Sequence, residues 1–395
     1  MKKILIIGAS ILQLPAIIRA KELGFYVATC DYNPNAVGTK YADEFFNVST
    51  IDINGVVSVA KKFNPDGIMT LATDMPIRSV AAASRALGLP GISIETAIKA
   101  TDKGEMIKAF KEQGVETPWF FIINNKDELD IVIEKLNFPC IIKPTDNSGS
   151  RGVILVNRKK DILDAYLYSK SESRNGSVII EEFMSGSEVS VEIMVVENHP
   201  HVLAITDKKT TGAPYFVEMG HAQQSQLPKG NIEKIKDISI RAVKAVGIKE
   251  GPAHVEIMLT SEGPKMVELG ARLGGDNITT HLVPLSTGID MIEATIKILT
   301  GEKPVVIPEF QKGSAIRYFS VPSGRVVSID GLDEAQAIEG VKQVTLLRSV
   351  GDNVNQLRSS NDRIGFVIAQ SDNTHKAINI CKEAIDKIKI QIDNA

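Results

Sequence analysis

The sequence predicts an α/β protein built from more than one domain, and three observations lead to this prediction. Short apolar runs alternate with amphipathic helical patterns from residue 1 to about residue 95, which is the order of a parallel sheet with helical crossovers. Two apolar runs that flank a glycine-containing loop near residue 260 then indicate an antiparallel hairpin. With 395 residues, the chain is long enough for two or three domains.

The composition excludes several classes of protein. Forty-five basic and 48 acidic residues give a net charge of −3, which offers no global field for nucleic acid or a membrane surface. Cys30, Cys140 and Cys381 lie far apart in apolar contexts, which favours a reducing compartment over a disulfide or zinc framework. The first apolar run, closed by Gly8, is too short for a signal peptide, and no run approaches the ~20 apolar residues of a membrane span. We therefore expect a soluble, cytoplasmic protein without nucleic-acid or membrane partners.

Residues 1 to about 95 read as a Rossmann-like domain. The turn that starts at Gly8 has one of the three glycines of a dinucleotide fingerprint, so we predict this fold without NAD. Thr73 and Asp74 follow the third strand at its carboxyl end, where open α/β sheets bind ligands; an N-cap of the next helix is the alternative. The predicted elements are a strand at 4–7, a helix at 12–23, a strand at 25–31, a helix at 56–63 and a strand at 67–71.

The hairpin from Ala253 to Arg272 carries the most informative pair of residues. Pairing about a three-residue loop that contains Gly263 places Glu256 directly opposite Glu268. Like charges ~5 Å apart across a ladder destabilise it, so we interpret the pair as ligands of a divalent cation such as Mg²⁺. A solvent-facing glutamate on a sheet edge is the alternative. Arg272, just past the second strand, can face an anion near the metal.

Two lysines precede the hairpin in contexts that favour an anion. Asp102 to Glu105 fits a capping box, which puts Lys103 in the first turn of a helix, where a cation is unfavourable unless it binds an anion. A tolerated surface lysine is the alternative. Lys143 ends an apolar strand and precedes the loop Thr145 to Val153, whose backbone N–H groups can wrap a phosphate. The loop is not a P-loop, because the GxxxxGK[ST] pattern is absent.

Further polar segments lie between these features. The segment Ser177 to Met194 reads as two strands separated by a short break, where backbone groups can pair with a flat polar ring and Glu188 can accept from ribose hydroxyls; a plain hairpin is the alternative. The stretch Thr206 to His221 reads as a loop near the site. The remaining predicted elements are helices at 232–246 and 289–299, strands at 315–321, 343–347 and 364–369, and a helix from 374 to about 388.

In this order, the two lysines, the glycine-rich loop, the run Glu181-Glu182-Phe183-Met184, the hairpin glutamates and the arginine resemble the ATP-grasp superfamily. The resemblance covers residues 1 to about 310. It implies a Rossmann-like pre-ATP-grasp domain at 1–95 and a two-lobed α+β ATP-grasp core at 96–302, with a lid at about 115–185. A small α/β cap at 303–395 would complete the chain.

The resemblance also implies roles for individual residues, with ATP and Mg²⁺ as cofactors and Mn²⁺ as a substitute for the metal. ATP would be held by Lys103 and Lys143 at its phosphates, by Ser148, Gly149, Ser150 and Gly152 of the loop, by Glu181, Glu182, Phe183 and Met184 at the adenine hinge, and by Glu188 at the ribose. Glu256 and Glu268 would hold the metal, and Arg272 and Gly275 would form an oxyanion hole. His254, Glu218 and His221 would line the substrate pocket; for His221 an ordinary loop histidine is the alternative.

The run from Glu268 to Asp276, with His254 two residues before Glu256, resembles the L-amino acid (dipeptide) ligase branch. It implies a small-molecule carboxylate, such as an amino acid, that attacks the γ-phosphate of ATP, and an amine that captures the acyl phosphate. Gly270 stands where many family members have a metal-binding asparagine, so a non-catalytic nucleotide-binding protein is one alternative. A phosphoribosylglycinamide synthetase-type ligase is another, and a homodimer is the state that the family implies.

Overall fold

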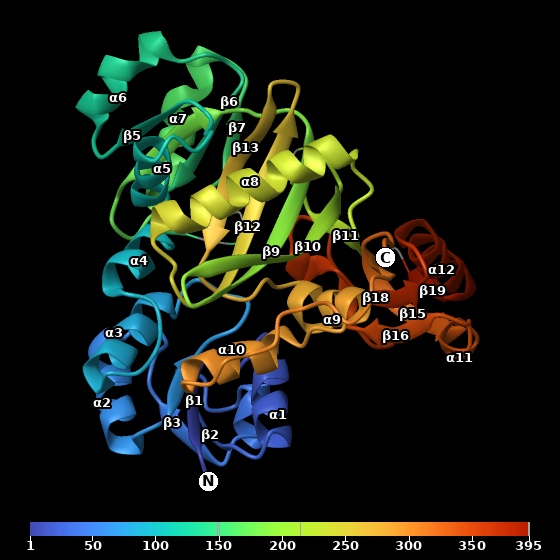
Figure 1. Ribbon diagram of the computed structural model, residues 1–395. Helices are drawn as coiled ribbons and strands as arrows, with labels where there is room; N and C mark the ends of the chain where they lie inside the picture. Colours follow the sequence, from blue (N-terminus) through green and yellow to red (C-terminus); the bar gives the residue numbers. More distant parts are fainter. Residues whose placement is uncertain (148, 150, 214, 394–395) are drawn as a thin grey trace. The chain divides into compact units, whose positions relative to one another are not determined.

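A computed structural model gives the fold and describes residues 1–147, 149, 151–213 and 215–393 (Figure 1). The chain forms two compact units. Unit 1 comprises Met1–Val202, Lys229–Asp276 and Met291–Val306, and unit 2 comprises Leu203–Pro228, Asn277–Asp290 and Ile307–Ala395. The three-domain division stays a prediction. None of the helices in the described ranges has the length and apolar character needed to cross a membrane.

Unit 1 begins with a parallel four-stranded sheet of the predicted Rossmann-like type. Its strands are β1 (Lys3–Ile7), β2 (Tyr26–Asp31), β3 (Glu44–Asn47) and β4 (Gly67–Met69), in the order β3-β2-β1-β4. Helices α2 (Ile53–Phe63) and α3 (Ile77–Leu87) lie on one face, and α1 (Leu14–Glu22) and α10 (Met291–Leu299) lie on the other (Figure 1). Because both faces are covered, the apolar run of β1 is buried from Ile4 onward.

A second sheet of unit 1 is antiparallel and has the order β5-β8-β6-β7. Its strands are β5 (Phe120–Ile123), β6 (Cys140–Pro144), β7 (Ile154–Val156) and β8 (Val178–Glu182). Helices α6 (Lys126–Val132) and α7 (Ile162–Ser171) bury apolar side chains against this sheet, among them Leu129 and Tyr166. The predicted phosphate-binding loop is the connection from β6 to β7, so the sheet fixes both of its ends.

A third group of unit 1 strands carries the hairpin. It has the order β13-β12-β9, all antiparallel, with β9 at Ser187–Val196, β12 at Gly251–Thr260 and β13 at Gly263–Gly270. Strands β8 and β9 belong to different sheets, so the alternative of a plain hairpin between them is wrong. The remaining helices of the unit are α4 (Ile94–Lys99), α5 (Lys103–Glu112) and α8 (Lys229–Val246).

The hairpin confirms the predicted pairing of the glutamates, although its loop length and its register each differ from the prediction by one residue. Glu256 lies directly opposite Glu268. The loop is one residue shorter than predicted, because Thr260 pairs with Gly263, and a register shift next to Ile257 restores the offset. The irregularity therefore lies beside the glutamates and not at the turn. Bulges of this kind re-aim side chains next to functional sites.

Unit 2 contains five antiparallel strands in the order β10-β11-β14-β18-β16. Their bounds are β10 His199–Thr210, whose first residues belong to unit 1, β11 Glu218–Gln223, β14 Gly313–Tyr318, β16 Val341–Leu346 and β18 Gly365–Ser371. Helix α12 (Thr374–Lys387) packs on β14 and β18 and buries Cys381 and Ala384 there.

Smaller elements complete the chain. Unit 2 also has helices α9 (Val283–Thr287) and α11 (Leu332–Gln336) and a sheet of order β17-β15-β19, formed by Asn353–Val354, Gly324–Asp330 and Lys389–Asp393. Short 3₁₀ segments are η1 Val37–Lys40, η2 Ile133–Lys135, η3 Lys159–Asp161 and η5 Ser360–Asp362, and η4 (Ile278–Leu282) is a π-helical turn.

The predicted loop from Thr206 to His221 is wrong for most of its length. Residues up to Thr210 belong to β10 and residues from Glu218 belong to β11, so only the connection between them is a loop. The polar character of the stretch favoured a loop, but Lys208 and Lys209 pair with His221 and Gly220 across the ladder. Tertiary pairing has overridden the local composition.

Candidate functional site

The two hairpin glutamates each lie beside a cation of the chain. Glu268 Oε1 accepts a hydrogen bond from Lys103 Nζ at 3.0 Å, and Glu256 Oε1 lies 3.6 Å from His254 Nε2. The repulsion expected between two carboxylates across the ladder is therefore offset within the protein. Both carboxylates keep a partly exposed surface, 23% for Glu256 and 28% for Glu268, so a metal or ligand can still reach them.

Lys103 stands at the start of α5 because Asp102 caps that helix. The Asp102 carboxylate accepts from the backbone N–H groups of Gly104 at 2.9 Å and of Glu105 at 3.1 Å. The prediction of a full capping box is wrong in its second half, because the Asp102 N–H donates to the carbonyl of Ile98. The N-cap alone is enough to fix where the helix starts and where Lys103 leaves it.

Lys103 also joins the glycine-rich loop to the hairpin. Besides its bond to Glu268, Nζ donates to the backbone oxygen of Asn147 at 2.8 Å. Burial lowers the pKa of Lys103, but the attraction of Glu268 outweighs it and the net shift is upward. The ammonium is therefore charged at neutral pH, and the surface-lysine alternative does not describe a side chain that is 11% exposed.

Two glycines of the loop adopt the left-handed backbone conformation that glycine favours. Gly149 and Gly152 have φ values of 68° and 77°, a region that favours glycine. A Cβ on Gly152 would lie 2.7 Å from a ring atom of Pro144, so the close approach also requires glycine. Ser148 and Ser150, which are predicted to contact phosphate, lie outside the described residues.

Lys143 and Glu181 form a buried ion pair on the second sheet, 2.6 Å between Nζ and Oε2. The two residues are 8% and 6% exposed. Lys143 pairs with Ile179 across the ladder, two residues from Glu181, so both side chains project from the same face. An isolated buried ammonium would be costly, and the Glu181 carboxylate supplies the opposite charge beside Lys143.

The predicted adenine hinge is partly occupied by contacts within the chain. Glu182 accepts from Lys265 Nζ at 3.1 Å with both carboxylate oxygens, and its backbone N–H donates to the carbonyl of Trp119 at 3.0 Å. Phe183 and Met184 follow in the connection that leads from β8 to β9. The backbone N–H of Glu182 is thus engaged, whereas its side chain tethers the second sheet to the hairpin. Lys265 was missed by sequence reasoning.

Asp74 holds Arg272 in a two-pronged ion pair. Arg272 Nε donates to Asp74 Oδ1 at 2.9 Å and Nη2 donates to Oδ2 at 3.0 Å, with both side chains 15% exposed. Burial lowers the pKa of Arg272, but Asp74 outweighs it and raises the pKa overall. The N-cap alternative for Asp74 is wrong, because α3 begins without a side-chain cap. Its position at the carboxyl end of β4 was the signal in the sequence.

Gly270 makes room for this ion pair. A Cβ on Gly270 would lie 2.8 Å from Asp74 Oδ1 and 3.1 Å from Arg272 Cζ. The Asp74 carboxylate therefore occupies space that a side chain at position 270 would need. The glycine that looks like a lost ligand in the sequence is, in the structure, a condition for the contact between Asp74 and Arg272.

His254 lies between Glu192 and Glu256 and is 6% exposed. Its Nδ1 is 2.7 Å from Glu192 Oε1, a carboxylate that is fully buried. Burial lowers the pKa of His254, but Glu192 outweighs burial and raises the pKa to about 9. A Cβ on Gly274 would lie 2.6 Å from His254 Nδ1, so glycine is required where the backbone passes this pair. Gly275 follows next, and its predicted oxyanion role stays a prediction.

These residues form one electrostatic cluster in unit 1. The pKa of Lys103 is raised by electrostatic attraction to Glu268, Asp74 and Glu181. The pKa of Arg272 is raised by electrostatic attraction to Asp74, Glu256 and Glu268. The structure thus brings together the predicted lysines, glutamates and arginine from four separate stretches of sequence. Glu192 was missed as a member, because its place opposite His254 depends on the pairing of β9 with β12, which the sequence does not reveal.

The cluster fits a divalent cation only in part. Glu256 and Glu268 supply oxygen ligands of the kind that Mg²⁺ prefers, and Mg²⁺ completes its shell with phosphates and water. No group of three or more His, Cys, Asp or Glu side chains in the described ranges is arranged to hold a metal by itself. The donor set suits a metal that arrives with a nucleotide rather than a resident structural ion.

Two predicted substrate residues, Glu218 and His221, belong to β11 of unit 2. Glu218 Oε1 lies 3.6 Å from Lys208 Nζ, and its backbone oxygen accepts from Arg363 Nη1 at 3.2 Å. His221 is 1% exposed. It is a buried strand residue, so the alternative of an ordinary loop histidine is wrong, and the substrate role of both residues stays a prediction.

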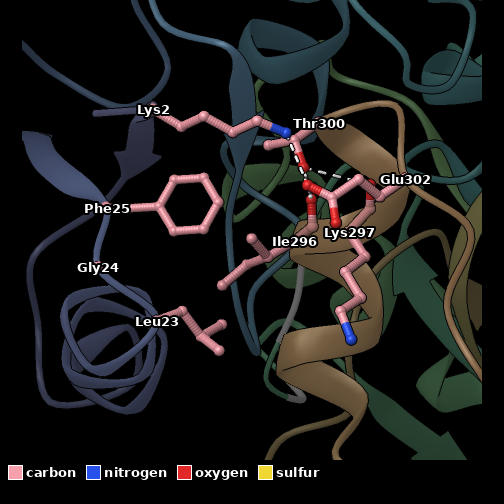
Figure 2. Close-up of a pocket in the computed structure, with 8 residues that line it drawn as sticks. All are labelled: Lys2, Leu23, Gly24, Phe25, Ile296, Lys297, Thr300 and Glu302. Atoms are coloured by element: carbon pink, nitrogen blue, oxygen red, sulfur yellow. Dashed lines mark hydrogen bonds and ion pairs between the residues drawn. The ribbon is translucent and has the colours of Figure 1, made fainter.

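A cavity of about 320 Å³ elsewhere in unit 1 is a poor candidate for chemistry (Figure 2). Lys2 and Glu302 form an ion pair at 2.6 Å on its wall, and Phe25 and Ile296 supply apolar surface. Lys297, the third charged residue of the wall, forms an ion pair with Glu293 at 2.6 Å. Every charged side chain of the wall thus has a partner, and the cavity offers no unpaired charge to a reacting group. The cysteines are equally unsuited, since burial raises the pKa of Cys30 to about 12 and that of Cys140 to about 11.

Comparison with known proteins agrees with this geometry. The model of the "ATP-grasp domain" matches residues 136–280, and the model of the "L-amino acid ligase C-terminal domain 2" matches residues 317–393. The chain belongs to the ATP-grasp superfamily. Its ATP-grasp domain thus contains Lys143, the glycine-rich loop and both hairpin glutamates, and an L-amino acid ligase C-terminal domain follows.

Several proteins similar to this ATP-grasp chain are ligases. Alanine–anticapsin ligase of Bacillus subtilis is 24% identical over 325 residues, 76% of this chain and 68% of that protein. L-amino acid ligase from Bacillus licheniformis, 24% identical, gives a TM-score of 0.85 over 100% of this chain and 99% of the other. Phosphoribosylglycinamide synthetase from Anaerococcus prevotii, 26% identical, gives 0.81 over 99% and 100%.

The ATP-grasp fold extends to proteins solved with nucleotide. The biotin carboxylase domain of Hydrogenobacter thermophilus 2-oxoglutarate carboxylase, in complex with MgADP and bicarbonate, gives a TM-score of 0.78. It is 16% identical over 99% of this chain and 91% of the other, which establishes a shared fold alone. The chain therefore carries an ATP-grasp domain, and the relatives named above that share its fold are ligases.

Proposed function

We propose that this chain is an ATP- and Mg²⁺-dependent ligase that joins the carboxylate of an amino acid to an amine and releases ADP and phosphate. The main support is the cluster in which Glu256 lies opposite Glu268 on the hairpin. Lys103 donates to Glu268, and Arg272 interacts electrostatically with both glutamates. Such a set supplies positioning and charge neutralisation and contains no nucleophilic side chain, which suits phosphoryl transfer.

The chemistry requires two steps. A carboxylate oxygen of the first substrate attacks the γ-phosphorus of ATP, the bond from γ-phosphorus to the bridging oxygen breaks, and ADP leaves. The nitrogen of the amine then attacks the acyl carbon, the bond from that carbon to the phosphate oxygen breaks, phosphate leaves and the amine gives up a proton. Developing negative charge arises in both steps, and fixed cations stabilise it without reorganisation.

We assign the residues as follows. Lys103 and Lys143 contact the ATP phosphates, and Glu256 and Glu268 hold Mg²⁺, for which Mn²⁺ can substitute. Arg272, with Gly275, stabilises the acyl phosphate and the tetrahedral intermediate. A bound metal would supply neutralisation of the phosphate charge. The segment from Glu181 to Met184 and the side chain of Glu188 bind the nucleoside.

Exchange of ion-pair partners explains how the site can bind a polyanion. Lys103 is held by Glu268 and Lys143 is held by Glu181. When phosphates take these ammonium groups, Glu268 becomes available to the metal that accompanies the nucleotide. Glu268 therefore keeps an opposite charge beside it in either state, Lys103 in one and the metal in the other.

The substrates, assembly and compartment are further parts of the proposal. We assign Glu218, His221 and His254 to the substrate pocket, as in the L-amino acid ligase resemblance, with small-molecule carboxylate and amine substrates. A homodimer is the expected assembly. A cytoplasmic location is supported by Cys30, Cys140 and Cys381, which are all free and buried.

A phosphoribosylglycinamide synthetase-type activity is the second candidate. It is favoured by the similarity to the Anaerococcus prevotii synthetase over 99% of this chain. The C-terminal domain match to the L-amino acid ligases favours the first candidate. A non-catalytic protein is less favoured, because Gly270 accommodates the contact of Asp74 with Arg272 and so does not by itself mark a decayed site.

The deciding experiment measures ADP and phosphate formation from MgATP with amino acids offered singly and in pairs, and with 5-phosphoribosylamine plus glycine. Turnover that requires two amino acids supports the first proposal and names its substrates. Turnover only with phosphoribosylamine and glycine transfers the assignment to the second candidate. Absence of turnover with every pair, while MgATP still binds, contradicts the proposed amino acid ligase.

A further inference from the structure

Three paired residues on neighbouring strands of unit 2 place a glycine between two cations, one on each side. Lys209 of β10 pairs with Gly220 of β11, and Gly220 pairs with Arg317 of β14. Residues directly opposite each other in an antiparallel ladder project from the same face, and the outer two lie roughly 10 Å apart at the backbone. Gly220 leaves the space between them without a side chain.

The side chain of Arg317 fills part of that space. A Cβ on Gly220 would lie 2.7 Å from both Cδ and Nη1 of Arg317, so the arginine lies across the glycine. Nη1 donates to the backbone oxygens of His221 at 3.0 Å and of Ile316 at 2.8 Å. These bonds hold the guanidinium over β11, between the strand it comes from and Lys209.

Arg317 is nevertheless only partly satisfied. Its Nε is buried without a hydrogen-bond acceptor, and within the described ranges Nη2 has no acceptor and no carboxylate forms an ion pair with the guanidinium. Burial lowers the pKa of Arg317, and the distant attraction of Asp207 does not compensate. A largely buried cation without a matching anion is costly, so a bound anion would be stabilising here.

A cavity of about 320 Å³ opens beside Arg317. Lys209 lines it from β10, and Lys382 and Asp386 line it from α12, one helical turn apart. Ser320 adds a hydroxyl, and Leu357 and Ile385 contribute apolar wall. Three cations and one carboxylate give the cavity an excess of two positive charges.

We propose that this cavity of unit 2 binds a phosphate dianion. The planar guanidinium offers donors in a fork that suits a tetrahedral oxyanion, and two ammonium groups can complete the neutralisation of a double negative charge. The dianion comes either as free inorganic phosphate or as the phosphate group of a larger metabolite, whose remaining atoms the apolar wall can accept. The site uses none of the residues assigned to ATP.

A substitution of Arg317 is a poor test, because Nη1 ties β14 to β11 and its loss would disturb the sheet. The informative variant is the double change Lys209→Ala and Lys382→Ala, since both lysines are exposed and neither forms an ion pair with a carboxylate of the described residues. The matched control is Lys342→Ala with Lys387→Ala, two exposed lysines of the same unit that do not line the cavity. Both variants lower the net charge by two.

The experiment is a calorimetric titration of the full chain with inorganic phosphate at constant ionic strength and saturating MgADP. We expect the Lys209/Lys382 variant to weaken phosphate binding by about tenfold or more, because two charge-assisted contacts are lost. The control should bind within about twofold of the parent, because only long-range screened charge is changed. No phosphate binding by the parent, or equal weakening in both variants, would overturn the proposal.

A parallel titration with glycerol 3-phosphate identifies the source of the dianion. Tighter binding of the ester than of inorganic phosphate, lost in the Lys209/Lys382 variant, supports a phosphorylated metabolite. Equal or weaker binding of the ester supports free phosphate. Because the titration measures binding and not turnover, its failure would leave the proposed ligase activity untouched.

Discussion

The two units differ in the partners of their buried cations, which are carboxylates in unit 1 and backbone oxygens in unit 2. In unit 1, Lys103 contacts Glu268, Lys143 contacts Glu181, and Arg272 contacts Asp74 through two bonds. In unit 2, Arg317 has backbone oxygens as its only acceptors among the described residues. The first arrangement can exchange partners with a nucleotide and metal, whereas the second can gain a partner without losing one.

The contrast determines what each site needs from its ligand. A polyanion that enters the unit 1 site must break existing ion pairs, so it needs an accompanying cation to take the released carboxylates. A dianion that enters the unit 2 cavity releases no carboxylate and needs no metal. Metal dependence should therefore separate the two sites, and substitutions in the unit 1 cluster test the first half of this statement.

The largest effect is expected from Glu268→Gln. The amide keeps the shape and a hydrogen-bond acceptor but removes a charged metal ligand, so ligase turnover should fall by about 10³-fold or more. The measurement is ADP formation as a function of Mg²⁺ concentration. Glu262→Gln, at the exposed turn of the same hairpin, is the control and should retain parental turnover. Full activity of the Glu268 variant would remove the metal assignment.

Arg272→Lys should act on kcat more than on nucleotide affinity. Lysine keeps the charge but cannot reproduce the two-pronged contact, so a fall in kcat of about 10²-fold is expected with a nearly unchanged KM for ATP. Steady-state kinetics with the best substrate pair gives both constants. A matching loss of ATP affinity would assign Arg272 to ground-state binding instead.

Changes at Asp74 and Gly270 test whether Arg272 is positioned by its neighbours. Asp74→Asn leaves the buried guanidinium without its carboxylate, and Gly270→Asn puts a side chain into the space that Asp74 occupies. Each should lower kcat by about tenfold, because the arginine is displaced and not removed. Because both changes act through the position of Arg272, kcat of the double variant should be no lower than that of the less active single variant. Additive losses would show that the two residues act separately.

The smallest effect concerns the charged state of His254. Its folded pKa of about 9 lies above the unfolded value near 6.5, so the contribution to stability is fully present below roughly pH 6.5 and is lost as pH rises through about 9. Glu192→Gln removes the main attraction and should flatten this pH dependence. Urea denaturation of the metal-free protein at roughly pH 6 and pH 10 measures it. An equally steep loss of stability in parent and variant would contradict the account.

The sequence anticipated the site where local rules govern structure. The pairing of Glu256 with Glu268 followed from hairpin geometry, although the loop is one residue shorter than predicted and an unpredicted register shift beside Glu256 compensates for it. Asp102 followed from capping preferences. Both features depend on residues that are close together along the chain, and so their physical causes can be read from a short window.

Features that depend on distant pairing were not anticipated. The predicted loop from Thr206 to His221 covers the end of β10 and the start of β11, whose polar residues gave no local sign that the two segments pair as strands. Glu192 and Asp74 lie 62 and 198 residues from their partners, His254 and Arg272. No local sequence pattern reveals such contacts. The need for glycine at position 270 likewise becomes clear only from the positions of Asp74 and Arg272 in the structure.

Acyl phosphate formation at the unit 1 cluster can be tested by following the oxygen atoms of the carboxylate substrate. The substrate identified in the turnover screen is supplied with ¹⁸O in its carboxylate, and the inorganic phosphate released from MgATP is analysed by mass spectrometry. The proposed chemistry predicts one ¹⁸O in each phosphate, because that oxygen bridges carbon and phosphorus before the amine attacks. Phosphate without ¹⁸O would mean that water attacks ATP, and the proposed ligase mechanism would be contradicted.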